Sequence, residues 1–101
     1  MADKKISKKA DEQMISELYD LIASLQNPQD CRDLFDDLCT YKEIEQMAQR
    51  IKAAKLLIEG NTYTQVTEQC DISSATLSRV SRCVQYGKGY TKFIKKIMTT
   101  G

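Results

Sequence analysis

The chain has 101 residues, 42% of them hydrophobic, with one Pro and four Gly, which is enough for one small helical domain spanning residues 1–101 and too short for two. The formal net charge of +1 is unevenly divided, because residues 1–70 carry a net −4 and residues 71–101 a net +5. The sequence has no histidine, no nucleophile beside a base and no phosphate-binding glycine loop, so we expect no enzyme and no cofactor. It also lacks a signal-peptide core and a membrane-spanning run, which favours a cytoplasmic protein.

The four cysteines do not have the CxxC spacing of a zinc site, and no histidine is present to complete one. Three of them fall on apolar helical positions, so we interpret them as small buried side chains in a reducing cytosol. We therefore expect neither a disulfide framework nor a metal site. The four are Cys31, Cys39, Cys70 and Cys83.

The N-terminal half of the chain predicts a basic tail followed by two helices. Residues 1–10 carry four lysines and are expected to be flexible, with a DNA-grasping arm as the alternative. A first helix is expected over residues 7–26, where apolar residues recur with helical period over an arc broad enough for more than one neighbour. Asn27 and Pro28 end it, and Pro28 is suited to open a second helix, whose acidic face we interpret as solvated.

A third, long helix is predicted to begin after Thr40, which forms a capping box with Glu43, and to end before Gly60, where a left-handed residue is favoured. Its apolar positions are Ile44, Met47, Ala48, Ile51, Ala54, Leu57 and Ile58. Near the C-terminus, Gly87 and Gly89 separate the preceding helix from a short final amphipathic helix. The lysines of that final helix are equally compatible with DNA phosphates and with solvent.

Residues 62–86 predict a helix-turn-helix element. Two short helices that cross steeply must touch through a few small apolar side chains, and this segment supplies them at three- and four-residue steps. They are Val66, Cys70, Ile72, Leu77, Val80 and Val84. Asp71 stands where the turn favours a residue able to adopt positive φ, and either Ser73 or Ser74 is placed to cap the second helix.

The first turns of the second motif helix carry small hydrogen-bonding side chains suited to a major groove. We expect Ser74, Ala75 and Ser78 to face base edges, with Thr76, Arg79, Ser81 and Arg82 nearer the backbone. The full set of candidate DNA-binding residues is Thr62, Gln65, Ser73, Ser74, Ala75, Thr76, Ser78, Arg79, Ser81 and Arg82. The alternative is an ordinary solvated helix of an all-α domain, but the apolar spacing, turn length, cap and polar face together favour DNA binding.

The segment from Leu38 to Lys96 resembles the Trp repressor family, and within it the tryptophan-repressor-related proteins. The resemblance rests on LCTYKEIEQMAQRIKAAKLLIEG, which leads into the motif and its SATLSRVSRC segment. It implies an all-α, six-helix fold that forms an intertwined homodimer. In such a dimer the first three helices and the last one interlock between chains, and two helix-turn-helix heads project toward successive major grooves.

The same resemblance implies an effector pocket between the core and the head, lined by Thr40, Arg50, Arg79, Val80 and Cys83. Thr40, Arg50 and Arg79 match residues of the family pocket. Val80 stands where the family has a glycine beside the indole of the corepressor tryptophan, and overpacking such a site costs about 1–3 kcal/mol. We therefore expect that tryptophan is not the corepressor, and the sequence leaves open whether another small molecule binds.

These observations lead to the hypothesis of a dimeric, sequence-specific transcriptional regulator of the repressor type, whose partners are double-stranded DNA and a second copy of the chain. The first motif helix has no Lys or Arg, so phosphate contacts would depend on Arg79 and Arg82. The alternative is a helical protein–protein interaction module that uses the helix-turn-helix as a scaffold. The near-zero net charge favours that alternative, whereas the basic C-terminal third favours DNA.

Overall fold

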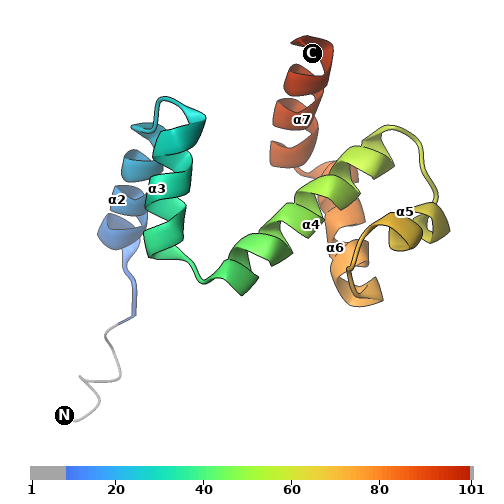
Figure 1. The fold of residues 1–101 in the computed structure, drawn as a ribbon, viewed down its shortest axis with the longest axis horizontal. Coiled ribbons are helices and arrows are strands. Elements are labelled where there is room, and N and C mark those ends of the chain that lie inside the picture. Colours follow the sequence, from blue (N-terminus) through green and yellow to red (C-terminus); the bar gives the residue numbers. More distant parts are fainter. Residues whose placement is uncertain (1–8, 101) are drawn as a thin grey trace. The chain divides into compact units, whose positions relative to one another are not determined.

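The structure, a computed structural model, describes residues 9–100, with side chains to residue 98, and over this range it is entirely helical outside the turns. Most of the predicted basic tail over residues 1–10 lies outside the described residues. The six helices are α2 (Glu12–Ala23), α3 (Pro28–Leu38), α4 (Tyr41–Ile58), α5 (Tyr63–Gln69), α6 (Ser74–Tyr86) and α7 (Gly89–Thr100) (Figure 1). The predicted all-α, six-helix fold is confirmed. No helix in the described part is long and apolar enough to cross a membrane.

Two compact units make up the chain, residues 1–38 and residues 39–101. In the first unit, α2 is shorter than the predicted helix and begins at an Asp11 cap, whose carboxylate accepts from the Met14 N–H at 2.9 Å. Pro28 opens α3, as predicted. Neither helix contains a buried residue, and Met14 is 55% exposed. The single domain over residues 1–101 therefore stays a prediction.

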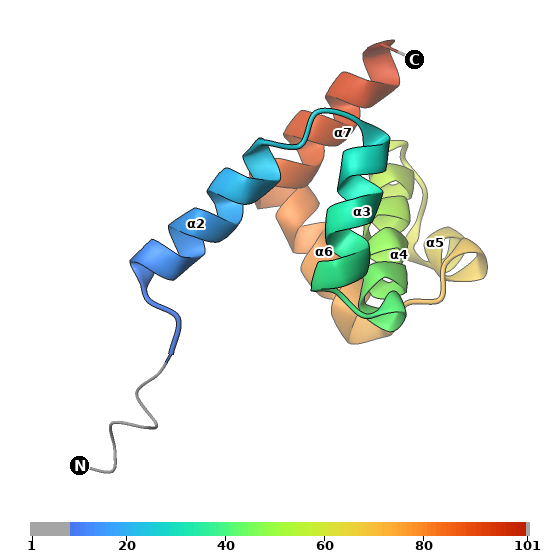
Figure 2. The same ribbon diagram turned by 60° about the vertical axis from the view of Figure 1, so that its left-hand side comes forward.

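The second unit has a continuous core. Helix α6 crosses α4 (Figure 1), and α5 and α7 also contact α4. Both views show α5 and α7 apart from each other (Figure 1 and Figure 2). The buried residues are Ala53, Ala54, Leu56, Val66, Cys70, Leu77, Val80 and Ile94. Four of the six apolar positions predicted for the motif are therefore buried, and the other two, Ile72 and Val84, pack against them.

The face of α4 that enters this core differs from the predicted one. Of the seven predicted positions only Ala54 is buried, Leu57 and Ile58 pack at the edge, and Ile51 is 51% exposed. The structure buries Ala53 and Leu56 instead. Small side chains at a helix crossing let two backbones approach closely, which suits Ala53 and Ala54, both 0% exposed, to the core face of α4.

The predicted ends of α4 are confirmed. Thr40 and Glu43 form the capping box, with the Thr40 N–H donating to Glu43 Oε1 at 2.8 Å and the Glu43 N–H donating to Thr40 Oγ1 at 3.1 Å. At the other end Gly60 has φ +98, and its N–H and that of Asn61 bond back to carbonyls of the last turn at 3.0 Å. This is the Schellman arrangement that needs a left-handed residue.

Candidate nucleic-acid interface

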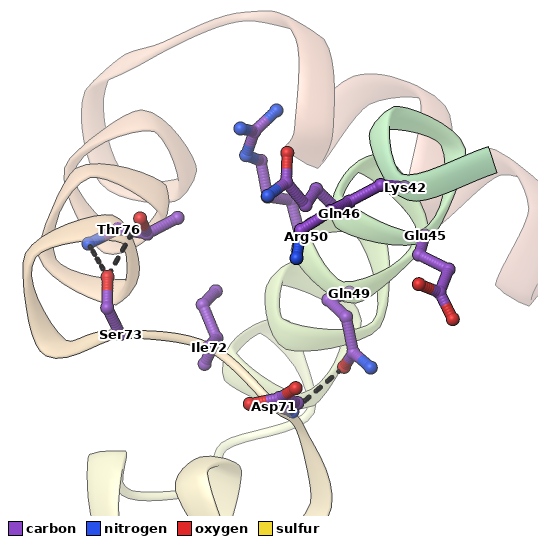
Figure 3. Close-up of a pocket in the computed structure, with 9 residues that line it drawn as sticks. All are labelled: Lys42, Glu45, Gln46, Gln49, Arg50, Asp71, Ile72, Ser73 and Thr76. Atoms are coloured by element: carbon purple, nitrogen blue, oxygen red, sulfur yellow. Dashed lines mark hydrogen bonds between the residues drawn. The ribbon is translucent and has the colours of Figure 1, made fainter. Parts of the chain in front are cut away.

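The first turn of α6 is fixed by its cap. Ser73 is the N-cap, and its Oγ accepts from the Thr76 N–H at 3.2 Å. The Ser73 hydroxyl also donates to Thr76 Oγ1 at 3.0 Å, as drawn in Figure 3. Ser73, one of the two predicted caps, therefore has a structural role, and it joins Thr76 to form a rigid entry into the helix.

Helix α6 has two distinct faces. Its buried side chains are those of Leu77, Val80 and Ser81, and its half-buried side chains are those of Thr76, Cys83 and Val84. The exposed positions between them include five of the predicted DNA contacts, which are Ser74, Ala75, Ser78, Arg79 and Arg82. These five lie at the helical spacing of one stripe, so small polar side chains at the start of the helix and two guanidinium groups further along share one surface.

Ser81 does not belong to that surface. The residue is only 7% exposed and lies on the face that packs into the core. Its predicted role near the DNA backbone was therefore wrong, because it stands four residues after Leu77, on the same side of the helix as that core leucine.

The start of α5 carries the other two predicted contacts, Thr62 and Gln65. They form a capping box: the Thr62 N–H donates to Gln65 Oε1 at 2.8 Å, and the Gln65 N–H donates to Thr62 Oγ1 at 3.2 Å. Both residues are exposed. Each has a structural role in starting α5, and the Gln65 amide nitrogen is left on the surface as a donor.

The turn between α5 and α6 is closed differently from the prediction. No non-glycine residue among those described has a positive φ, so the expectation of a left-handed Asp71 was wrong. Cys70 is extended, with φ −127 and ψ 144. The Asp71 N–H instead donates to the side-chain oxygen of Gln49 on α4 at 3.0 Å (Figure 3).

A hollow of about 470 Å³ lies at the predicted effector pocket. It is lined by Arg50, Ala75, Thr76, Arg79, Val80, Cys83 and Tyr90. Four of the five predicted residues are present. Thr40 is not among the lining residues, and its hydroxyl takes part in the capping box of α4. Sequence reasoning missed Tyr90, which enters from α7 and is brought in only by tertiary packing.

The two arginines of this hollow come from different helices, Arg50 from α4 and Arg79 from α6. Both are exposed, and neither forms an ion pair with a residue that the structure describes. Val80, by contrast, is 2% exposed and is one of the largest fully buried side chains. The hollow therefore combines two unpaired cationic groups with a wall that belongs to the core.

A second, more polar hollow of about 350 Å³ lies beside the first and shares Arg50 and Thr76 with it. Its lining is Lys42, Glu45, Gln46, Gln49, Arg50, Asp71, Ile72, Ser73 and Thr76. Figure 3 shows α4 on one side of it and the turn with the start of α6 on the other. The signal for this surface in the sequence is the helical spacing of Lys42, Gln46 and Gln49, which places the three side chains on one face of α4.

Comparison with known proteins agrees with this geometry. The family model described as Trp repressor protein matches residues 13–98. The chain belongs to the Trp repressor family. A relative from Bacillus subtilis (strain 168), the uncharacterized protein YerC, is 45% identical over 73 residues, which covers 72% of this chain and 70% of YerC.

Two solved structures are similar over most of their length. A crystal structure of a candidate Trp repressor from Staphylococcus aureus superposes with a TM-score of 0.80 at 36% identity, covering 96% of this chain and 94% of that one. A TrpR-like protein from Eubacterium eligens ATCC 27750 gives a TM-score of 0.78 at 37% identity, covering 84% and 89%. The predicted resemblance to the family is therefore confirmed.

Proposed function

We propose that this member of the Trp repressor family is a sequence-specific DNA-binding transcriptional regulator of the repressor type. The observation that carries the proposal is the two-faced α6, in which a capped first turn presents Ser74, Ala75 and Ser78 beside Arg79 and Arg82. A rigid helix with small polar side chains at its start can approach base edges closely, while guanidinium groups further along reach phosphates. The basic C-terminal third adds attraction to DNA.

Serine and alanine offer little bidentate discrimination between bases, so we expect water-mediated contacts and DNA shape to contribute to specificity. Contacts from α5 would depend on polar groups such as the Gln65 amide, since α5 has no Lys or Arg. Arg79 and Arg82 would then provide much of the phosphate neutralisation of each head.

We propose further that the DNA-binding form is an intertwined homodimer. Two surfaces of the chain support this. Helix α2 exposes the large apolar side chains of Met14, Ile15, Leu18, Tyr19 and Leu21. Within the second unit, Ile51 of α4 and Phe93 of α7 line an apolar hollow of about 460 Å³. The Phe93 side chain is 54% exposed. Apolar surface of this extent is typical of protein interfaces, and two heads would read two half-sites.

The experiment is selection of binding sites from a random DNA library with the purified protein, followed by titration of the best site at two salt concentrations. We expect an enriched palindromic site bound by a dimer. Ser78→Ala should change the sequence preference, whereas Arg82→Ala should weaken specific and random DNA alike and lower the salt slope by about one unit per lost phosphate contact. Equal losses on both DNAs for both variants would contradict the assigned roles, and no enriched site would favour the protein-docking module.

We propose that tryptophan is not the corepressor. Val80 fills the core contact between α4 and α6 and also lines the hollow beside the two arginines. Placing an indole against it would require about 1–3 kcal/mol of repacking, so the affinity would fall by roughly one to two orders of magnitude. Isothermal titration with L-tryptophan should therefore show no micromolar binding, and site titrations should be indifferent to added tryptophan. Micromolar affinity for tryptophan would refute this proposal but would not test the proposal of DNA binding.

A further inference from the structure

A single side-chain hydrogen bond ties the DNA-reading turn to the long helix α4. The Asp71 backbone N–H donates to Gln49 Oε1 at 3.0 Å, which joins residues 22 positions apart. The side-chain bonds that cap α4, α5 and α6 join residues only three positions apart and act within one helix end. The Gln49 bond therefore links the turn to α4, whereas those caps are local.

The bond gives a partner to an amide for which the turn itself provides no backbone acceptor. Helix α5 ends with the Cys70 N–H bonded to the Val66 carbonyl at 2.9 Å, and Cys70 and Ser73 both have extended backbones, with ψ 144 and 157. The next amide, that of Asp71, has no helical carbonyl to bond. Gln49 supplies the acceptor that a tighter, left-handed turn would have provided within the loop.

The bond also gives the head a second point of attachment to α4. The first is the core contact, where Ala53 and Ala54 are fully buried against residues such as Val66 and Leu77. The packing of side chains between helices restricts their crossing angle, although the apolar contacts themselves have no preferred direction. Gln49 lies one helical turn before Ala53, and a hydrogen bond has a preferred direction. The bond therefore adds a directional restraint to an angle that the core packing already limits.

We propose that Gln49 is a positioning residue that sets the angle of the turn and the start of α6 on α4, and so aims Ser74 and Ser78 at base edges. This inference rests on the proposed DNA-binding function for its effect on affinity, but the geometry itself is a property of the free protein. Because the bond is solvent-exposed, water competes with it. Its loss should lower the ratio of aligned to misaligned heads by about two- to tenfold.

The test compares Gln49→Leu with Gln46→Leu. Leucine keeps the helix propensity and length but accepts no hydrogen bond. Gln46 lines the same hollow and makes no hydrogen bond to the other residues drawn in Figure 3. In the free protein we expect amide exchange at Asp71 to rise about two- to tenfold in Gln49→Leu only, with exchange at core amides such as Leu77 unchanged. Residual dipolar couplings should show α6 less ordered relative to α4 in that variant.

A rescue variant separates the acceptor from the side chain's bulk. Glutamate at position 49 keeps an acceptor oxygen, and Asp71→Asn removes the like charge beside it. Gln49→Glu in an Asp71→Asn background should therefore match Asp71→Asn alone in both exchange and couplings. A double variant that behaves like Gln49→Leu would overturn the assignment of the bond.

On DNA, Gln49→Leu should bind the selected site about two- to tenfold more weakly for each head engaged, while its affinity for random DNA and its salt slope stay at the Gln46→Leu values. Loss of binding to both DNAs, or no loss on the selected site, would overturn the positioning role. If the unaltered protein selects no site, the proposed function fails, and the inference is then decided by the exchange and coupling measurements. If Gln49→Leu leaves the amide exchange at Asp71 and the dipolar couplings of α6 unchanged, the positioning role is refuted.

Discussion

Gly87 is required at the junction of α6 and α7 for space and not for its backbone angle. Its φ is −86, an angle that any residue adopts. A Cβ built there, however, would lie 2.7 Å from the Cys83 carbonyl oxygen and 3.4 Å from the Cys83 carbonyl carbon. The same carbonyl accepts the Gly87 N–H at 2.8 Å. Alanine would therefore have to push apart the last turn of α6, where the obstructing atoms are backbone.

The expected cost follows from two opposing terms. Overpacking against backbone atoms, which cannot rotate away, destabilises the fold by about 1–3 kcal/mol. Alanine also reduces the conformational entropy of the unfolded chain, which stabilises the fold by about 0.4–1 kcal/mol. Gly87→Ala should thus lower the free energy of unfolding by about 1–2 kcal/mol. Gly89, two residues later, is the matched control, because a Cβ there meets nothing within 4 Å. Gly89→Ala should be neutral or stabilising by about 0.4–1 kcal/mol.

The assay is urea unfolding of the three proteins by circular dichroism at one protein concentration, since the proposed dimerisation would make stability concentration-dependent. For a domain of this size, each kcal/mol corresponds to a shift of about 4–8 °C in the thermal midpoint, so the two variants should separate clearly in a thermal scan as well. If Gly87→Ala is as stable as Gly89→Ala, the close approach to Cys83 does not constrain the junction, and this reasoning is wrong.

Three further changes test the core and the helix ends by the same unfolding measurement. Leu77→Ala, at a side chain that is 1% exposed, should cost about 3–5 kcal/mol, and a cost below about 1 kcal/mol would mean that Leu77 is not central to the core. Thr40→Ala removes one half of the capping box and should cost about 1 kcal/mol, whereas Thr40→Ser should preserve stability. Gly60→Ala should cost about 1–2 kcal/mol through its φ of +98 alone, and a neutral result would contradict that strain.

The ends of α4 and the start of α6 could be predicted because their signals are local, whereas α2 spans Glu12–Ala23 and not the predicted residues 7–26. The Thr40–Glu43 box, the Ser73 cap and the Gly60 C-terminus each depend on residues within one turn of one another. Pro28 likewise predicts the start of α3 through a single residue. Such features can be read from the sequence because no distant segment has to be placed first.

The wrong predictions involve distant partners or the choice of helix face. Asp71 was expected to close its own turn, but the structure closes it through Gln49, which no local pattern indicates. On α4, the apolar period favoured large residues such as Ile51, while the crossing with α6 selects Ala53. Ser81 is different, since its spacing from Leu77 and Val84 could have placed it in the core.

The candidate DNA surface and the candidate effector hollow differ in how far sequence can define them. The exposed stripe belongs to one helix, so the period of α6 is enough to separate Arg79 from Leu77. The hollow needs α4, α6 and α7 together, and Tyr90 could not be assigned before α7 was placed. Val80 connects the two cases, because it belongs both to the core and to the wall of the hollow. Any substitution that widens the hollow there also removes packing from the core. A change of ligand at the candidate hollow would therefore be coupled to the stability of the core that holds α6 in place.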